Sequence, residues 1–284
     1  MIRQITLTEE MRASLAKGVD AHKYSHGHAL VLAGGPGKGG AARLAARAAL
    51  RVGAGLVTLL CPQVALPENA AQLNAVMLTA LPDAYALRGL LRDSRITALC
   101  LGPALGQPRA LEMVPAALWG RRPTVLDADA LTAFVPDTAP LMSALHADVV
   151  LTPHFGEFLA LFPDLGDALN EGALTRIEAA RHAADRAGCV VLLKGPETAI
   201  AAPSGEAALH AATGAEAAPW LATAGSGDVL AGLITGLMAR GLAPFEAACT
   251  GTWLHAAAAR SFGPGLIAED LPEEIPKVFR ALAL

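Results

Sequence analysis

Short apolar runs alternate along the chain with longer alanine-rich segments whose apolar residues recur at helical spacing. The short runs are continuous, which is typical of strands buried on both faces of a sheet. We expect strands at residues 29–33, 56–60, 97–101, 124–126, 149–151 and 189–193, and helices at 41–52, 84–93, 108–119, 156–162 and 171–187. Strands interleaved with crossover helices predict an α/β protein with three α/β/α layers and a mostly parallel central sheet.

The C-terminal third departs from this alternation. Residues 198–202 and 207–210 flank a Pro-Ser-Gly turn, which predicts a hairpin. Residues 228–240, 244–260 and 271–284 then read as helices with no strand between them. Because no Pro/Gly/Ser linker, charge block or repeat divides the chain, we expect a single domain over residues 1–284.

The composition narrows the class of protein. A hydrophobic fraction of 53% with 17% charged residues excludes intrinsic disorder. The net charge of -4 and the lack of a basic stripe argue against a nucleic-acid partner. The apolar runs are shorter than the roughly 18 residues of a membrane span. Four cysteines without a CxxC pair indicate a reducing, cytoplasmic setting.

A glycine-rich loop, residues 34–40, follows the first expected strand and opens a helix. It contains GxGxxG, but the acid that a dinucleotide fingerprint needs about 20 residues later is missing. Gly39 stands where a P-loop places Ser or Thr after its lysine, so that motif fails as well. Two readings stay open: a helix N-terminus that binds an anion, and a tight turn that needs positive φ.

Polar turns follow three later strands, where doubly wound sheets bind their ligands. Asp127 and Asp129 either cap the next helix or orient a substrate or hydrated metal. His154 is expected to face a ligand, whereas Glu157 has the alternative role of a first-turn acid. Lys194 would bring a cation to nucleotide phosphates, or simply begin a hairpin.

The sharpest signal lies at residues 225–228. Gly225, Ser226 and Gly227 lead directly into a helix, and successive backbone N–H groups in such a turn form an anion hole. That geometry suits a transferring phosphoryl group. Asp228 is then positioned to take a proton from an attacking hydroxyl, although Asp is also a common N-cap.

Taken together, these motifs resemble the ADP-dependent NAD(P)H-hydrate dehydratases of the ribokinase-like superfamily. The resemblance runs from residues 23–28 through the last helices and includes 47–58, 102–106, 127–131, 152–157, 194–198 and 225–228. It implies that the hydrate site is lined by Ala41, Gly102, Gly106, His154 and Asp228. It also implies that Lys194, Gly195, Pro196, Glu197, Thr198 and Gly227 hold the adenine nucleotide. The chain departs from the family pattern at Ala104, where a glycine is usual, and at Ala218, where Asn is frequent.

The activity implied by the resemblance is dehydration of the S-epimer of hydrated NADH or NADPH (NADHX, NADPHX) at the expense of ADP. Asp228 would deprotonate the hydrate hydroxyl as it attacks the β-phosphoryl group, with Mg²⁺ offsetting charge; which residues would ligate a metal stays unknown. The resemblance also implies a homo-oligomer, specifically a tetramer, and a separate NAD(P)H-hydrate epimerase as a functional partner. Two alternatives stay open: a ribokinase-like kinase of a vitamin precursor or sugar, and a non-catalytic nucleotide-binding regulator.

Overall fold

The structure, a computed structural model, describes residues 2–212 and 214–284. Over these residues, ten strands form one sheet in the order β1-β10-β9-β8-β7-β6-β5-β2-β3-β4. The strands are β1 Ile2–Gln4, β2 His28–Leu32, β3 Leu56–Cys61, β4 Met77–Ala80, β5 Ile96–Leu101, β6 Thr124–Leu126, β7 Val149–Leu151, β8 Val190–Leu193, β9 Glu197–Ala201 and β10 Ala207–Ala211. All neighbours pair in parallel except β9, which is antiparallel to β8 and β10.

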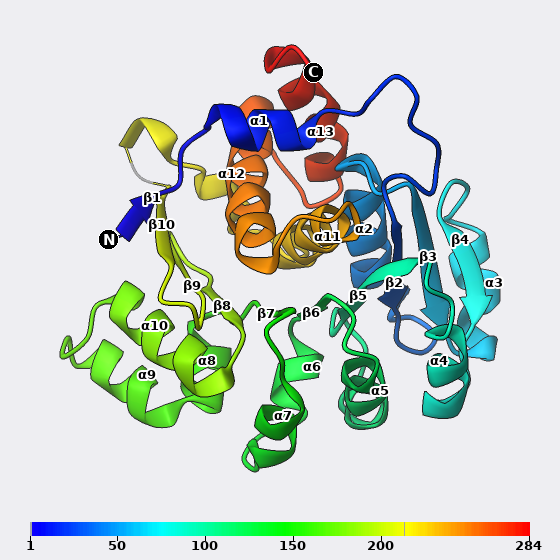
Figure 1. The fold of residues 1–284 in the computed structure, drawn as a ribbon, viewed down its shortest axis with the longest axis horizontal. Coiled ribbons are helices and arrows are strands. Elements are labelled where there is room, and N and C mark those ends of the chain that lie inside the picture. The colour runs from blue at the N-terminus through cyan, green and yellow to red at the C-terminus, as the bar shows by residue number, and fades with distance from the viewer. Residues whose placement is uncertain (1, 213) are drawn as a thin grey trace.

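Helices cover both faces of this sheet, so the prediction of a mostly parallel three-layer α/β fold is confirmed (Figure 1). One layer contains α1 Glu9–Leu15, α2 Gly39–Arg51, α11 Ser226–Ala239, α12 Pro244–Phe262 and α13 Asp270–Ala281. The other contains α4 Ala84–Leu90, α5 Gln107–Trp119, α6 Asp129–Thr132, α7 Ala139–Ala144, α8 Phe155–Leu161, α9 Pro163–Asn170 and α10 Arg176–Ala187. The short α3, Leu66–Ala70, follows β3. Within the described ranges, no helix is long and apolar enough to span a membrane.

The six expected strands and the hairpin are present, whereas the expected helix at 171–187 is wrong at its start. The helix begins only after Thr175, whose backbone N–H donates to Glu178 Oε2 at 2.8 Å. The Thr175 side chain in turn accepts from the Glu178 N–H, which completes a capping box. The sequence reading also missed β1, β4 and several short helices. β4 is an edge strand whose residues alternate between exposed and partly buried, without a continuous apolar run.

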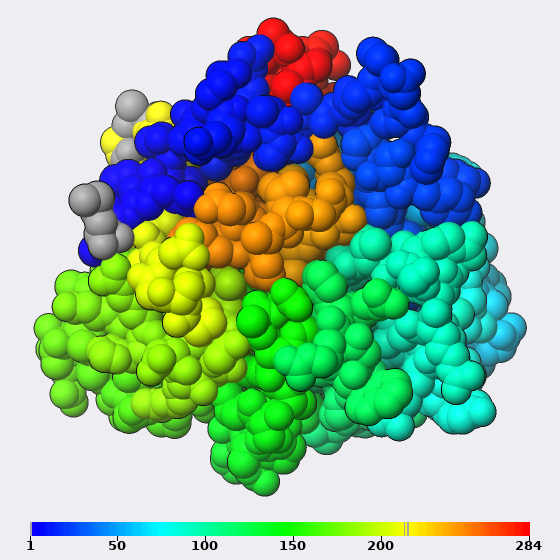
Figure 2. Space-filling model, in the orientation of Figure 1, coloured from blue at the N-terminus to red at the C-terminus, as the bar shows by residue number. Residues whose placement is uncertain are grey.

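The N-terminal segment packs across the C-terminal helices. The Arg12 guanidinium donates to the Leu282 carbonyl at 2.8 Å, and Arg3 forms an ion pair with Glu246 of α12. Figure 2 shows this segment lying over the surface of α12. These contacts join the two ends of the chain on one face of the sheet.

Close packing of α11 against α2 fixes the position of the α11 N-terminus. A Cβ atom at Gly232 would lie 2.2 Å from the Ala45 carbonyl oxygen, and one at Gly236 would lie 2.6 Å from that of Ala49. The two helices therefore approach to a distance that only glycine permits on this face of α11. The first turn of α11, residues 226–229, is held in place by this contact.

We expect Gly232→Ala to destabilise the protein by about 2–3 kcal/mol, because the added methyl group overlaps backbone that cannot move independently. Denaturant unfolding followed by circular dichroism measures this change. Gly89→Ala is the matched control, since a Cβ there meets no atom within 4 Å. The control should be neutral or slightly stabilising. Equal effects of the two substitutions would contradict the packing argument.

Candidate active site

Asp127 anchors the site at the carboxyl end of β6. Its side chain is 2% exposed, and Oδ1 accepts hydrogen bonds from Thr152 Oγ1 at 2.9 Å and Lys194 Nζ at 2.6 Å. Thr152 follows β7 and Lys194 follows β8, so three neighbouring strands meet at one carboxylate. Asp127 therefore orients the lysine, and does not cap the following helix.

Lys194 reaches from this carboxylate to the first turn of α11. A Cβ atom at Gly227 would lie 3.3 Å from Lys194 Nζ, so the cation sits directly beside the glycine turn. Gly225 has φ +90°, and a Cβ there would lie 2.8 Å from Leu44 and 3.9 Å from Asp228 Oδ2. A glycine is thus required both at the turn and at the approach to α2.

The site gathers three carboxylates around one ammonium group. Burial raises the pKa of Asp228 to about 6, helped by the negative charges of Asp127 and Glu157 and opposed by Lys194. Burial also raises the pKa of Glu157. Burial alone would lower the pKa of Lys194, but the three carboxylates outweigh it and raise that pKa. At neutral pH, Asp228 is therefore a mostly ionised carboxylate with the proton affinity of a general base.

The anion hole predicted at Gly225, Ser226 and Gly227 has backbone donors only. Ser226 Oγ donates to the Leu221 carbonyl at 2.7 Å, so the hydroxyl points away from any bound anion. The first N–H groups of α11 have no partner within the helix and carry its positive dipole end. His255 Nε2 lies 2.9 Å from the Ser226 carbonyl oxygen and holds the turn from α12. Burial lowers the pKa of His255 to about 4, so it acts here as a neutral donor.

His154 takes part in capping α8, a structural role at the helix start that the sequence suggested only for Glu157. Its Nδ1 accepts from the N–H groups of Gly156 at 3.0 Å and Glu157 at 3.3 Å, while Glu157 Oε2 accepts from the His154 N–H. The pair forms a capping box at the start of α8. The His154 side chain is 61% exposed, and Nε2 lies 3.5 Å from Glu157 Oε1. The ring edge therefore remains open to solvent.

Gly102 and Gly106 lie against the Asp127 turn. A Cβ atom at Gly102 would lie 1.6 Å from the Asp127 carbonyl oxygen, and Gly106 N–H donates to Asp129 Oδ2 at 2.8 Å. Asp129 thus holds the backbone at the start of α5. Ala104 has φ +49°, a conformation that favours glycine, so the departure at this position keeps the backbone shape. Ala128, with φ +47°, directs the two carboxylates of this turn apart.

The glycine-rich loop near the start of α2 is a tight turn. Gly37 has φ +75°, and its N–H donates to Glu68 Oε2 at 2.7 Å. This contact occupies the Gly37 N–H only, and the anion-binding interpretation of the first N–H groups of α2, which begins at Gly39, stays a prediction. Ala41 lies in the first turn of α2, one turn before Leu44, which packs on Gly225. The α2 helix therefore lies beside the residue 225–228 turn, and the residue of α2 that contacts Gly225 is Leu44, one turn after Ala41.

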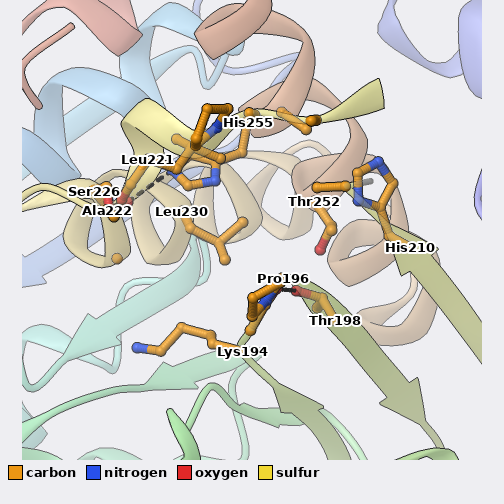
Figure 3. Close-up of a pocket in the computed structure, with 17 residues that line it drawn as sticks. Lys194, Pro196, Thr198, His210, Leu221, Ala222, Ser226, Leu230, Thr252 and His255 are labelled. Atoms are coloured by element: carbon orange, nitrogen blue, oxygen red, sulfur yellow. Dashed lines mark hydrogen bonds between the residues drawn. The ribbon is translucent and has the colours of Figure 1, made fainter. Parts of the chain in front are cut away.

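A cavity of about 480 Å³ opens beside Lys194 and the glycine turn, between β8, β9 and α12 (Figure 3). Of the residues predicted to bind a nucleotide, five line it: Lys194, Gly195, Pro196, Thr198 and Gly227. Glu197 does not line it; the Glu197 carbonyl accepts from Arg176 Nε at 2.8 Å instead. Asp228 is outside the lining and lies on the Lys194 side of the turn.

Sequence reasoning missed the far wall of this cavity, formed by His210, Thr252 and His255. Thr252 and His255 are three residues apart on α12 and face the same side. His210 comes from the hairpin strand β10. The helical spacing of Thr252 and His255 was a readable signal, but nothing in the sequence linked either residue to the glycine turn.

The described part of the chain contains no cluster of three His, Cys, Asp or Glu side chains placed to hold a metal ion. Asp127 is already engaged by Lys194 and Thr152. The residues present therefore do not form a metal centre by themselves. Mg²⁺ commonly binds through one or two carboxylates together with substrate phosphates, so it does not need a complete set of protein ligands.

Comparison with known proteins identifies relatives over most of the chain. The sequence model of a family described as NAD(P)H-hydrate dehydratase matches residues 29–277. The chain is 39% identical over 281 residues to a bifunctional NAD(P)H-hydrate repair enzyme of Salinibacter ruber, covering 93% of this chain and 50% of the relative. It is 37% identical over 249 residues to an ADP-dependent (S)-NAD(P)H-hydrate dehydratase of Neisseria meningitidis, covering 86% of this chain and 80% of the relative. The chain spans about half the length of the bifunctional relatives.

Solved structures share the fold. An ADP/ATP-dependent NAD(P)H-hydrate dehydratase of Bacillus subtilis, co-crystallised with ATP/Mg²⁺, has a TM-score of 0.79 at 28% identity and covers 99% of both chains. A ribokinase-like superfamily protein of Enterococcus faecalis has a TM-score of 0.81 at 20% identity, covering 99% of this chain and 96% of the other. The second likeness bears on the fold alone and confirms its ribokinase-like type.

The raised pKa of Asp228 predicts a specific effect of pH on stability. A carboxyl whose pKa rises from 3.8 to about 6 on folding stabilises the protein below its unfolded pKa, and that contribution is lost as pH rises through 6. Asp228→Asn stays neutral, so between pH 4 and pH 8 it should gain about 2–3 kcal/mol relative to the wild type. Urea unfolding at each pH measures the difference.

Asp164→Asn is the control for this titration. Asp164 is exposed and its pKa is lowered to about 2, mainly by its hydrogen bond with Arg186, so its contribution to stability is lost only as pH falls below the unfolded pKa of 3.8. Asp164→Asn should therefore lower stability by a nearly constant amount from pH 4 to pH 8. If the Asp228→Asn and wild-type stabilities instead run parallel from pH 4 to pH 8, the carboxylate is not destabilised by the site.

Proposed function

Because the chain belongs to the NAD(P)H-hydrate dehydratase family, we propose that it dehydrates the S-epimer of hydrated NADH or NADPH, using ADP as co-substrate. The observation that carries this proposal is the position of Asp228. It is a carboxylate of raised pKa on a glycine turn, beside Lys194 and next to a cavity large enough for an adenine nucleotide.

In this proposal the adenine nucleotide occupies the cavity between the β8–β9 loop and α12. Lys194, Gly195, Pro196, Glu197, Thr198 and Gly227 were expected to hold it, and five of these six support the assignment by lining the cavity. The apolar walls suit a purine ring, while the terminal phosphate extends toward Lys194 and the N–H groups of the turn. The turn at Gly225, Ser226 and Gly227 is the proposed anion hole.

The proposed chemistry makes a poor leaving group into a good one. The hydroxyl oxygen of the hydrate bonds to the β-phosphorus of ADP while Asp228 accepts the hydroxyl proton, and AMP departs. The ring nitrogen then expels phosphate, and loss of the neighbouring ring proton restores the double bond of the reduced nicotinamide. Lys194 and the backbone N–H groups stabilise the charge on the transferring group.

The hydrate is proposed to lie between the turn of α11 and the strand ends, near Ala41, Gly102, Gly106, His154 and Asp228. The contacts of Gly102 and Gly106 with the Asp127 turn support this placement, as does the approach of α2 to Gly225. His154 supports it only through its exposed ring edge. A Cβ atom at Gly102 would overlap the Asp127 carbonyl, so only glycine lets the end of β5 approach the Asp127 turn this closely.

Further features of the proposal concern the enzyme as a whole. Mg²⁺ would arrive with the nucleotide phosphates, because the chain supplies no complete ligand set in its described part. We propose that the chain acts as a single domain and assembles as a homo-oligomer, specifically a tetramer, in the cytoplasm. The bifunctional name of the longer relatives supports cooperation with an NAD(P)H-hydrate epimerase.

Asp228→Asn should lower turnover of NADH hydrate with ADP about 10³-fold, because the amide cannot accept the hydroxyl proton. Recovery of absorbance at the reduced-nicotinamide band measures the rate. Binding of ADP, measured by calorimetry, should persist. In the wild type, kcat/KM should fall as pH drops below about 6, where Asp228 of the free enzyme becomes protonated. Turnover of Asp228→Asn within tenfold of the wild type would reject its role as base.

The products separate dehydration from the kinase alternative. A dehydratase should yield reduced nicotinamide, AMP and free phosphate in equal amounts, because the phosphorylated hydrate breaks down. A small-molecule kinase of the same fold would instead leave a stable phosphoester on an added vitamin precursor or sugar. Mass spectrometry of the reaction mixtures decides between them, and absence of any product alongside ADP binding would favour the regulatory alternative.

A further inference from the structure

A second cavity, of about 640 Å³, runs along the side of α2 and is bounded by the loop before β4 and by α13. Three arginines line it at intervals of four residues: Arg43, Arg47 and Arg51. This spacing puts all three on one face of the helix. From Gly40 to Arg51 the groove follows α2 for roughly 16 Å.

The arginines present hydrogen-bond donors suited to phosphate. Arg47 and Arg51 both form ion pairs with Glu273 of α13, which holds their side chains next to each other. Arg43 Nη1 donates to Asn69 Oδ1 at 3.0 Å, a neutral partner that orients the guanidinium without cancelling its charge. Each guanidinium has five N–H donors, so these contacts leave donors for a second acceptor.

The groove carries other polar and apolar groups as well. Besides the arginines, Glu269 is the one ionisable residue that lines the groove within the described part of the chain, so arginines outnumber carboxylates there even when Glu273 is included. Leu44, Leu73 and Val76 supply an apolar wall. A lining that combines a row of cations with apolar side chains fits a ligand that has both phosphates and a flat ring.

Leu44 is the residue of the groove wall that also packs against the residue 225–228 turn. A Cβ atom at Gly225 would be 2.8 Å from Leu44 Cδ1. The adenine-nucleotide cavity reaches the same turn from different elements, the β8–β9 loop and α12. A substrate that presents its hydroxyl to Asp228 can therefore extend along α2 without entering that cavity.

We propose that this groove binds the adenosine end of the dinucleotide hydrate, with Arg43, Arg47 and Arg51 on its phosphates. This inference rests on the proposed function, because it assumes that a dinucleotide hydrate reacts at Asp228. The phosphates of the hydrate lie away from its reacting ring. When the ring is at the turn, they therefore need cationic side chains at some distance from it, and the arginines along α2 provide them. Affinity for the arm comes from the groove, and the chemistry comes from the turn.

The test compares two substrates with the same reacting ring. NADH hydrate has the phosphates and the adenosine arm, and the hydrate of reduced nicotinamide riboside lacks both. Arg47→Met and Arg43→Met should each raise KM for NADH hydrate about tenfold or more, as loss of a charged hydrogen bond predicts. KM for the riboside hydrate and for ADP should stay within about twofold. Arg186→Met, at an exposed ion pair with Asp164, should change neither.

Glu273→Gln separates a binding role from a structural one. It weakens the ion pairs of Glu273 with both Arg47 and Arg51, whereas Arg47→Met removes only the first, and it keeps both arginines. KM for NADH hydrate should stay the same or fall. A rise in KM equal to that of Arg47→Met would overturn the proposal, as would equal effects of the arginine substitutions on both hydrates or no effect on either.

Equilibrium binding of NADPH, measured by calorimetry, makes this test independent of turnover. Arg43→Met and Arg47→Met should weaken NADPH binding about tenfold, and binding should decrease as salt concentration rises. If the wild type binds NADPH in this way but converts no hydrate, the proposed function fails and the groove stands as a dinucleotide site. If hydrate is converted and the arginine variants bind NADPH like the wild type, the groove proposal fails and the function stands.

Discussion

The ion pair between Lys194 and Asp127 is the interaction on which the site depends. It joins residues 67 positions apart along the chain, with Nζ and Oδ1 separated by 2.6 Å in a nearly closed environment. A buried charge pair of this kind adds little to stability by itself, and removal of one partner leaves the other uncompensated. Its value here is positional: the lysine is held between a strand end and the glycine turn of α11.

Small residues determine where the glycine turn lies. Gly232 and Gly236 let α11 approach α2 so closely that Leu44 reaches Gly225. The α11 N-terminus therefore points toward the strand ends with N–H groups that have no partner within the helix, and Asp228 is brought near Lys194, Asp127 and Glu157. The raised pKa of Asp228 follows from burial among like charges. The close packing of α11 on α2 therefore also determines the basicity of this carboxylate.

Much of this arrangement could be predicted from the sequence. Continuous apolar runs located the strands of the parallel sheet, and the Pro-Ser-Gly turn located the hairpin of β9 and β10. Strand ends in a parallel sheet share one edge, which is why the polar turns after β6, β7 and β8 converge. The glycines around Asp228 were also informative, since a simple N-cap does not need them.

The rest could not be predicted, for identifiable physical reasons. Which lysine meets Asp127 depends on strand register, which the apolar runs do not fix. His154 caps a helix through a ring nitrogen, although His is not among the usual N-cap residues. Ala128 and Ala104 occupy positive φ values that the sequence gives no reason to expect of alanine. The four-residue spacing of the α2 arginines was visible, but the facing wall of their groove comes from distant segments.

The proposed reaction requires that Asp228 faces the hydrate hydroxyl while the terminal phosphate of ADP lies on the glycine turn. A crystal structure of the Asp228→Asn protein with ADP and NADH hydrate tests this requirement. We expect the hydroxyl about 3 Å from the side chain of residue 228, with the β-phosphate on the N–H groups of the turn. A β-phosphate bound away from the turn, or a hydroxyl directed elsewhere, would contradict it.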